Sequence, residues 1–309
     1  MHFIHPLKIA GTASIAVLAF YSLTTRLHAH GFEGDRFFPP TIQTDDPFAV
    51  DELSLPVVSV FNNPAGGGAP KTREINISSE FDKEIFPKFA LGISDTYIIL
   101  KPHGESTRTG FDNLSLSAKY QLFENAPHEF IFSLGGRIDV GGTGNRSIGR
   151  ESFSTYTPTL YVGKGFGDLP AALKYLKPFA LTGTLGYVIP SEYVDPNALS
   201  WGVALEYSLP YLQQHVQEIE WLRPFRNVIP LVEFAMNSPL NRGGGQTTGT
   251  INPGFLWESR YFQIGAEAVI PANRATGPNV GAIVQVQIYI DDLLPKIFGY
   301  PLFLGGESK

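Results

Sequence analysis

The sequence contains no cysteine and few charged residues. Across 309 residues, this absence excludes a disulfide framework, a cysteine-ligated zinc or iron–sulfur site and a cysteine nucleophile. Asp, Glu, Lys and Arg make up 17% of the chain, below the soluble average of about 25%, whereas 32 glycines and 23 phenylalanines are present. The net charge of -6 and the scattered basic residues favour no nucleic-acid partner.

Long hydrophobic runs are lacking after the N-terminus. Residues 1–29 carry Lys8, an apolar stretch from Ile9 to Leu23 and the ending Leu27-His28-Ala29. This order is typical of a secretory signal peptide cut after Ala29, with an uncleaved anchor as the alternative. Cleavage removes two basic residues and no acid, which takes the formal charge from -6 to -8. No later segment approaches about 18 apolar residues, so no transmembrane helix is predicted in the mature chain.

From about residue 73 the chain alternates apolar and polar residues with a period of two, which predicts strands. The clearest case sets Leu116, Ala118 and Tyr120 against Ser117 and Lys119. We predict twelve strands, at 54–62, 73–81, 88–100, 112–123, 128–141, 153–166, 177–190, 198–211, 225–237, 248–258, 260–271 and 279–291. Many approach the length of about 9–11 residues that crosses a bilayer at a tilt. The register is ambiguous in 88–100, which Asp95 interrupts, and in 225–237, where both faces are apolar.

Two kinds of connection alternate between these strands. One kind is rich in Gly, Asn, Thr and Arg, as in 141–152 and 238–249, and the other is short or carries a compact Leu/Pro motif, as in 167–179 and 211–225. Such alternation is typical of an antiparallel up-and-down barrel with long outer loops and tight periplasmic turns. The sequence therefore predicts an all-β transmembrane barrel of about twelve strands with both termini in the periplasm.

This fold class divides the chain into four parts. We expect a signal peptide at 1–29, a periplasmic N-terminal tail or strap at 30–53, the barrel at 54–291 and a C-terminal periplasmic tail at 292–309. The predicted location is the outer membrane of a Gram-negative bacterium, reached by signal-peptide-dependent export. A secreted β-sandwich is the alternative fold, but a soluble protein of this size would carry more surface charge.

The strand spacing, strand lengths and loop style over roughly residues 70–291 resemble those of Gram-negative outer-membrane channels encoded beside phenol meta-cleavage pathways. The start of the mature chain resembles a related subgroup in the stretches Gly31-Phe32, Arg36-Phe37-Phe38-Pro39, Thr44-Asp45-Asp46-Pro47-Phe48 and Asp51-Glu52-Leu53-Ser54. The resemblance implies a barrel that passes small, often aromatic or apolar molecules, and it assigns no particular substrate. We expect a passive uptake channel for small solutes, without a catalytic residue, metal or cofactor.

The strand alternation predicts which charged residues face the lumen. The predicted pore-lining residues are Glu74, Glu80, Lys119, Glu129, Arg137, Asp139, Glu206, Glu233, Glu258 and Glu267. Their excess of carboxylates would favour neutral or cationic solutes. The alternative is that these groups form hydrogen-bonded networks with Lys119 and Arg137 that fill a narrow barrel. Side chains fill the interior of a barrel of about eight strands, whereas a barrel of about sixteen strands leaves an aqueous channel. A barrel of twelve strands has an intermediate width, so the strand number does not decide between these alternatives.

Five arginines fall in the predicted outer loops: Arg108, Arg146, Arg150, Arg242 and Arg274. Because arginine binds phosphate through two hydrogen bonds, these residues are candidate contacts to lipopolysaccharide, alongside outer-membrane lipid as a partner. Solvated loop charges are the alternative interpretation. The sequence does not determine the oligomeric state.

Two further alternatives concern the tail and the chemistry. The tail at 30–53 either plugs the pore or docks a periplasmic partner through Phe32, Phe37, Phe38 and Phe48, or lies as a strap on the barrel rim, which we favour. A plugged, structural or adhesive barrel is therefore a second possible role. A lipid-modifying hydrolase is disfavoured because no G-x-S-x-G motif occurs and no histidine lies in a nucleophile motif.

Overall fold

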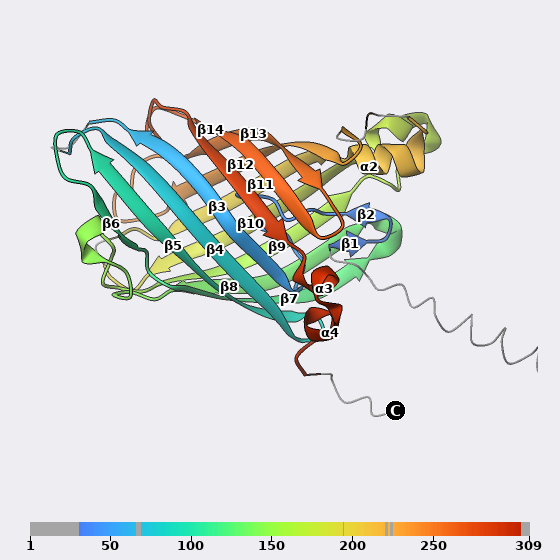
Figure 1. Cartoon of the computed structure of the whole chain (residues 1–309), viewed down its shortest axis with the longest axis horizontal. Coiled ribbons are helices and arrows are strands. Elements are labelled where there is room, and N and C mark those ends of the chain that lie inside the picture. The colour runs from blue at the N-terminus through green and yellow to red at the C-terminus, as the bar shows by residue number, and fades with distance from the viewer. Residues whose placement is uncertain (1–30, 66–68, 194, 220–221, 223–224, 304–309) are drawn as a thin grey trace, which may run out of the picture.

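The computed structural model describes residues 31–65, 69–193, 195–219, 222 and 225–303. The signal peptide predicted at 1–29 lies outside these ranges. Twelve antiparallel strands form a closed barrel (Figure 1), because β15 pairs with β3 and β4 pairs with β5. The short strand β6 and strand β7 both pair with β5 and together make one barrel strand.

The barrel strands are β3 (Glu52–Asn63), β4 (Thr72–Phe86), β5 (Phe89–Pro102), β6 (Arg108–Phe111), β7 (Ser115–Asn125), β8 (Phe130–Asp139), β9 (Thr155–Gly165), β10 (Phe179–Pro190), β11 (Ala198–Tyr207), β12 (Val228–Pro239), β13 (Thr248–Glu258), β14 (Phe262–Pro271) and β15 (Gly281–Ile288). All twelve predicted strands are confirmed. The largest differences are that β4 continues to Phe86 and that β11 ends at Tyr207 instead of 211. Strand β15 ends at Ile288, before helix α3 (Ile290–Leu293).

The two kinds of connection lie at opposite ends of the barrel. Loops 103–107, 140–154, 240–247 and 272–280, together with the described residues of 64–71 and 191–197, lie at one end, which we call the loop end. The other end, the turn end, has the connections that are short or carry small helices: η1 (Ala126–His128), η3 (Ala171–Leu176), α2 (Leu209–Tyr211) and η4 (Leu212–Val216). The described N-terminal residues and helices α3 and α4 (Pro295–Phe298) also lie at the turn end (Figure 1). None of the described helices is long and apolar enough to span a membrane.

The polarity of the barrel is the reverse of that of a soluble protein. Large apolar side chains such as Leu116, Leu134 and Leu160 point outward and are more than 40% exposed. Glu233 and Gln263 are fully buried on the inner face. A belt of exposed apolar side chains around a polar interior is the arrangement that a lipid bilayer stabilises.

The N-terminal segment, residues 31–51, lies inside the barrel. It begins with a hairpin of β1 (Phe32–Glu33) and β2 (Arg36–Phe37), seen within the turn end in Figure 1. Gly34 makes the hairpin turn with φ of +64°, and a Cβ there would collide with the carbonyl oxygen of Ala126. This placement differs from the strap on the barrel rim that the sequence analysis favours.

Two apolar clusters explain why the segment prefers the lumen to the rim. Phe38 and Phe48 pack with Ile131 and Ala180, and Phe37 and Ile42 pack against inward-facing residues of β12 and β13, namely Ile229, Leu231 and Leu256. Packing against the segment also explains why the register of 225–237 is ambiguous in the sequence. The inner face of this strand is apolar because part of it contacts the segment rather than water.

Replacement of Leu160 by arginine tests the outward belt. Leu160 pairs with Leu134 and Leu185 on its two neighbouring strands, and all three are exposed. An outward arginine in lipid should lower the free energy of unfolding by about 2–4 kcal/mol, as measured by urea unfolding in vesicles. The adjacent variant Thr159→Arg, which faces the interior cavity, should change it much less. Equal losses in both variants would contradict the assigned faces.

Candidate functional site: the lumen and its two cavities

The N-terminal segment lines two cavities inside the barrel. The larger, which we call the vestibule, has a volume of about 930 Å³ and lies between the segment and the loop end. Its walls carry mainly Ser, Thr, Asp and Glu side chains from β3 to β11, and its floor includes Pro40, Thr41, Gln43, Asp45 and Asp46 of the segment. The smaller cavity, of about 300 Å³, lies at the turn end.

The vestibule is strongly acidic. Among the described residues, ten acidic side chains line it, against the two basic residues Arg137 and Arg150, and Lys119 pairs with one of the ten, Asp45. The carboxylates are Asp45, Asp46, Glu52, Glu74, Glu80, Asp82, Asp95, Asp112, Asp139 and Glu151. An enclosed surface with this excess of one sign concentrates cations and repels anions.

The structure places all ten predicted lumen residues on the interior, but in three groups. Glu74, Glu80, Arg137 and Asp139 line the vestibule, where Arg137 pairs with Asp139 at 3.3 Å. Glu258 lines the smaller cavity. The other five lie against or near the N-terminal segment: Lys119, Glu129, Glu206, Glu233 and Glu267.

Backbone groups of the segment satisfy buried side chains of the barrel wall. The amides of Gln43 and Thr44 donate to the two oxygens of Glu233 at 2.8 and 2.9 Å, and the amide of Ala49 donates to Gln121 at 2.8 Å. Lys119 donates to the Asp45 carboxylate at 2.9 Å and to the Asp46 carbonyl at 2.8 Å. The wall therefore supplies many of the hydrogen bonds that a chain segment needs when it leaves water.

Arg36, which the sequence analysis did not select, is the most buried cation of the site. We call Arg36, Glu129 and Tyr211 the latch. The fully buried Arg36 pairs with Glu129 at 3.3 Å, donates to the carbonyls of Lys177 and Pro178, and lies 3.8 Å from the centre of the Tyr211 ring. Tyr211 donates its hydroxyl to Glu129 at 3.0 Å, and the amide of Gly167 donates to the same carboxylate at 2.8 Å.

The Tyr211 hydroxyl of the latch stays protonated over the physiological range. Burial, followed by the negative charge of Glu129, raises the pKa of Tyr211 to about 12, so the phenol stays protonated and keeps its hydrogen bond. An isolated buried arginine would be costly, but here each of the three guanidinium nitrogens donates a hydrogen bond. The latch thus fixes the hairpin of the segment to the 166–178 connection and to α2.

The five predicted outer-loop arginines do not form one surface. Arg150 turns inward, pairs with Asp112 at 2.9 Å and lines the vestibule. Arg242 donates to the carbonyls of Glu192 and Asp195 and lies 4.2 Å from the centre of the Tyr193 ring, so it holds two loops together. Arg108, Arg146 and Arg274 are exposed at the loop end.

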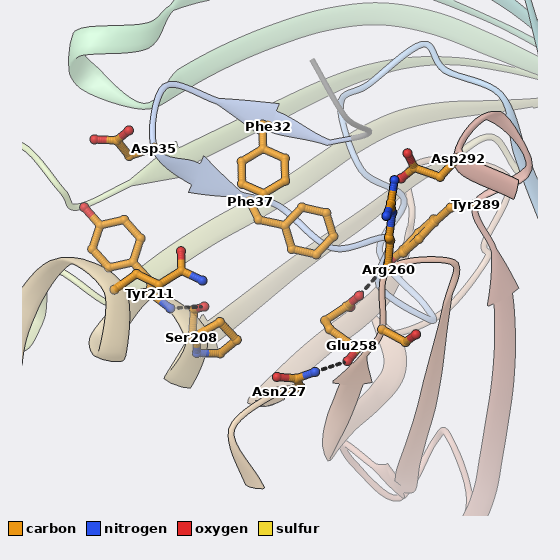
Figure 2. A pocket seen from close by; sticks show the side chains of 13 residues that line it. Phe32, Asp35, Phe37, Ser208, Tyr211, Asn227, Glu258, Arg260, Tyr289 and Asp292 are labelled. Carbon is orange, nitrogen blue, oxygen red and sulfur yellow. Dashed lines mark hydrogen bonds between the residues drawn. The ribbon is translucent and has the colours of Figure 1, made fainter. Parts of the chain in front are cut away.

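The second cavity, the turn-end pocket, opens beside the hairpin (Figure 2). In the figure, Phe32 and Phe37 lie between Tyr211 on one side and Glu258 and Tyr289 on the other. Glu258 accepts a hydrogen bond from the Tyr289 hydroxyl at 2.7 Å. The sequence analysis selected Glu258 from strand parity but gave no sign of the aromatic residues around it.

The described residues contain no arrangement of histidine and serine side chains that is typical of a hydrolase site. His128 contacts Asp168 at 3.0 Å, and His215 stacks on Tyr211, with ring centres 4.5 Å apart. Among the described residues no histidine is hydrogen-bonded to a serine hydroxyl, and no group of three or more His, Asp or Glu side chains is arranged to hold a metal ion. A nucleophile and its base would have to lie within hydrogen-bond reach.

Comparisons with known proteins agree with the architecture. An outer-membrane channel from Pseudomonas putida F1 superposes with a TM-score of 0.52 over 81% of this chain and 99% of that chain, at 12% sequence identity. The chain has the fold of an outer-membrane barrel. Two other solved structures are more distant. The KdgM porin has a TM-score of 0.42 at 10% identity and covers 76% of this chain and 98% of that chain. Outer membrane phospholipase A from Escherichia coli has a TM-score of 0.41 at 10% identity and covers 84% of this chain and 94% of that chain. No protein-family model and no curated protein sequence matches the chain.

Removal of the latch arginine should release the hairpin while the barrel stays folded. Arg36→Ala leaves Glu129 buried without its ion-pair partner, a change that costs about 3–5 kcal/mol in such sites. Hydrogen exchange of the amides of residues 32–37 should accelerate accordingly. Arg150→Ala removes a half-exposed ion pair at the far end and should leave these amides unchanged. Unchanged exchange in Arg36→Ala would contradict the role of the latch.

Glu33 should make hairpin docking depend on pH. Burial, and then the charge of Glu124, raise the pKa of Glu33 from 4.5 to about 7, with Lys88 acting in the opposite direction. The docked hairpin therefore holds a proton that the released hairpin loses, so docking weakens as the pH rises from about 4.5 to about 7 and is constant above. Opening free energies from hydrogen exchange, corrected for intrinsic rates, should show this slope. Glu33→Gln should abolish it, and a persisting slope would assign it to another group.

Proposed function

We propose that this protein is an outer-membrane channel for small solutes, and that the N-terminal segment closes its lumen in the resting state. The observation that carries the proposal is the vestibule, a polar cavity of about 930 Å³ inside a closed barrel with an apolar outer belt. A purely structural barrel has no need of such a cavity. The floor residues Gln43 and Thr44 donate backbone hydrogen bonds to Glu233 of the wall, and water can replace these bonds when the segment leaves.

The acidic vestibule supports neutral or cationic solutes over anions. The excess of acidic side chains over arginines among its described lining residues supports a negative potential between the loop end and the segment. Hydroxyl-bearing side chains such as Ser78, Thr96 and Ser115 provide hydrogen bonds without charge. The family resemblance of the sequence adds aromatic and apolar molecules to the candidate solutes.

The orientation follows from the two kinds of connection. In outer-membrane barrels the short turns face the periplasm and the longer loops face outward. We therefore place the turn end, the N-terminal segment and the C-terminal residues in the periplasm, after export directed by the predicted signal peptide. The vestibule then opens to the outside, and Arg108, Arg146 and Arg274 are the loop residues available to lipopolysaccharide phosphates.

A permanently plugged, structural barrel is the second candidate. It is favoured by the burial of Phe38 and Phe48 in the wall, which makes the segment resemble a core rather than a loose stopper. The two roles differ in one respect. A channel must conduct when the segment moves, whereas a structural barrel stays closed or unfolds.

An engineered disulfide between the segment and the wall distinguishes these roles. Because the sequence contains no cysteine, the two introduced cysteines have no native thiol to pair with. A Cβ atom on Gly202 would lie 2.9 Å from Thr44 Oγ1 and 3.3 Å from Thr44 Cγ2, so Thr44→Cys with Gly202→Cys can join the segment to β11. In planar bilayers the oxidised double variant should be silent, and reduction should restore cation-selective steps. A variant lacking residues 31–51 should conduct continuously and more strongly.

The two single-cysteine variants are the controls, and reduction should not alter their conductance. A silent deletion variant that still shows the heat-modifiable gel shift of a folded barrel would overturn the channel. Equal conductance of the locked and reduced proteins would instead show that solutes pass by a route that the segment does not close.

A further inference from the structure

Residues 293–303, which we call the C-terminal segment, form an apolar stretch outside the barrel at the turn end (Figure 1). Lys296 is the only charged residue in this stretch of the sequence. Exposed apolar side chains gathered on one part of a folded chain mark an interaction surface. Six large apolar or aromatic side chains of the segment are at least 45% exposed: Leu293, Leu294, Ile297, Tyr300, Leu302 and Phe303.

Backbone hydrogen bonds fix the C-terminal segment to the end of β4. This strand continues four residues beyond Asp82, the last residue that pairs with β3, because the chain before β3 turns into the barrel interior. The carbonyls of Glu84 and Ile85 accept hydrogen bonds from the amides of Leu302 and Phe303 at 3.0 and 2.8 Å. The segment therefore takes the place beside β4 that β3 leaves open.

Ring contacts place the C-terminal segment on the outer face of this strand. Phe81 points outward, because its two neighbours in the sequence line the vestibule. Phe298 meets Phe81 edge to face, with ring centres 6.1 Å apart. The ring of Phe303 lies 5.5 Å from that of Phe86, which is 48% exposed. The apolar surface of the segment is thus continuous with the outward belt of the barrel.

The charges beside the C-terminal segment suit the surface of a bilayer. Lys83 pairs with the Asp51 carboxylate at 2.5 Å and donates to the carbonyl of Tyr300 at 2.9 Å, so its charge has partners within the protein. Lys296 is exposed on α4, and its long side chain is able to reach a phosphate group. Apolar side chains, a tyrosine and a single cation match the boundary between acyl chains and head groups.

We propose that the C-terminal segment is an interfacial anchor, and that its partner is the phospholipid of the leaflet at the turn end. The acyl chains contact Ile297 and Leu302, and Lys296 lies at the phosphate groups. Because the segment starts after β15 and ends beside β4, it covers the junction at which the first and last strands of the barrel meet. The inference rests on the proposed membrane location and not on whether the barrel conducts.

Nitroxide labels on single cysteines test the anchor, since the sequence has no native cysteine. Ile297→Cys and Leu302→Cys report on the segment, Leu160→Cys on the outward belt and Glu105→Cys on the exposed loop end. In phospholipid vesicles, power saturation compares collisions of each label with oxygen, which concentrates in lipid, and with a nickel chelate, which stays in water. At an interfacial depth of about 5–10 Å, labels at 297 and 302 should meet the chelate roughly fivefold less often than the label at 105.

The two control labels separate failure of the anchor from failure of the membrane location. Chelate collisions at 297 and 302 equal to those at 105, with a lipid-exposed label at 160, would overturn the anchor and leave the membrane barrel intact. A water-exposed label at 160 would overturn the membrane location and the anchor with it.

A second copy of the chain is the other occupant that the labels detect. Labels at 297 and 302 would then be shielded from both reagents, and their spectra would show spin–spin broadening that disappears on dilution with unlabelled protein. That result would assign the surface to a dimer and overturn the anchor. Oxygen collisions at 297 and 302 as frequent as at 160, without broadening, support lipid as the partner.

Discussion

The carboxylate of Glu233 is fully buried inside the barrel, and the two backbone amides that satisfy it belong to the N-terminal segment rather than to the wall. This exchange of hydrogen bonds is the constraint on which the rest of the structure depends. A barrel in lipid must turn its polar residues inward, and at twelve strands its interior is too wide for those residues to reach one another. A segment that carries unpaired amides and apolar side chains completes the interior.

The same constraint explains why the lumen is uneven. Where the segment lies, the wall presents Ile131, Ile229 and Leu256 to it, so burial of apolar surface adds to the hydrogen bonds. Where the segment is absent, the wall presents carboxylates and hydroxyls that remain solvated. The latch marks the boundary at the turn end, where Arg36 joins the hairpin to two connections at once. The result is a polar vestibule, a partly apolar closure and an aromatic pocket along one axis.

The period-two pattern predicted the barrel strands and the inward parity of all ten selected charges, because one side of each strand faces lipid and the other does not. It did not predict where the N-terminal segment lies, since residues 30–53 have no period that points to a partner surface. Two signals were present nonetheless. The apolar inner positions of 225–237 and Ile131 among the inward residues of β8 have no reason to face water, and both contact the segment. Arg36 could not be selected from sequence, because its partners are 93 and 142 residues away.

Hydrogen exchange of the mature protein in lipid nanodiscs tests the central claim, that the N-terminal segment fills the lumen, most directly. The amides of Gln43, Thr44 and Ala49 donate to buried wall side chains, so they should exchange orders of magnitude more slowly than a free chain and nearly as slowly as the strand amides. Exchange of these three amides at the rate of an unstructured peptide, in a barrel whose strand amides are protected, would contradict the account.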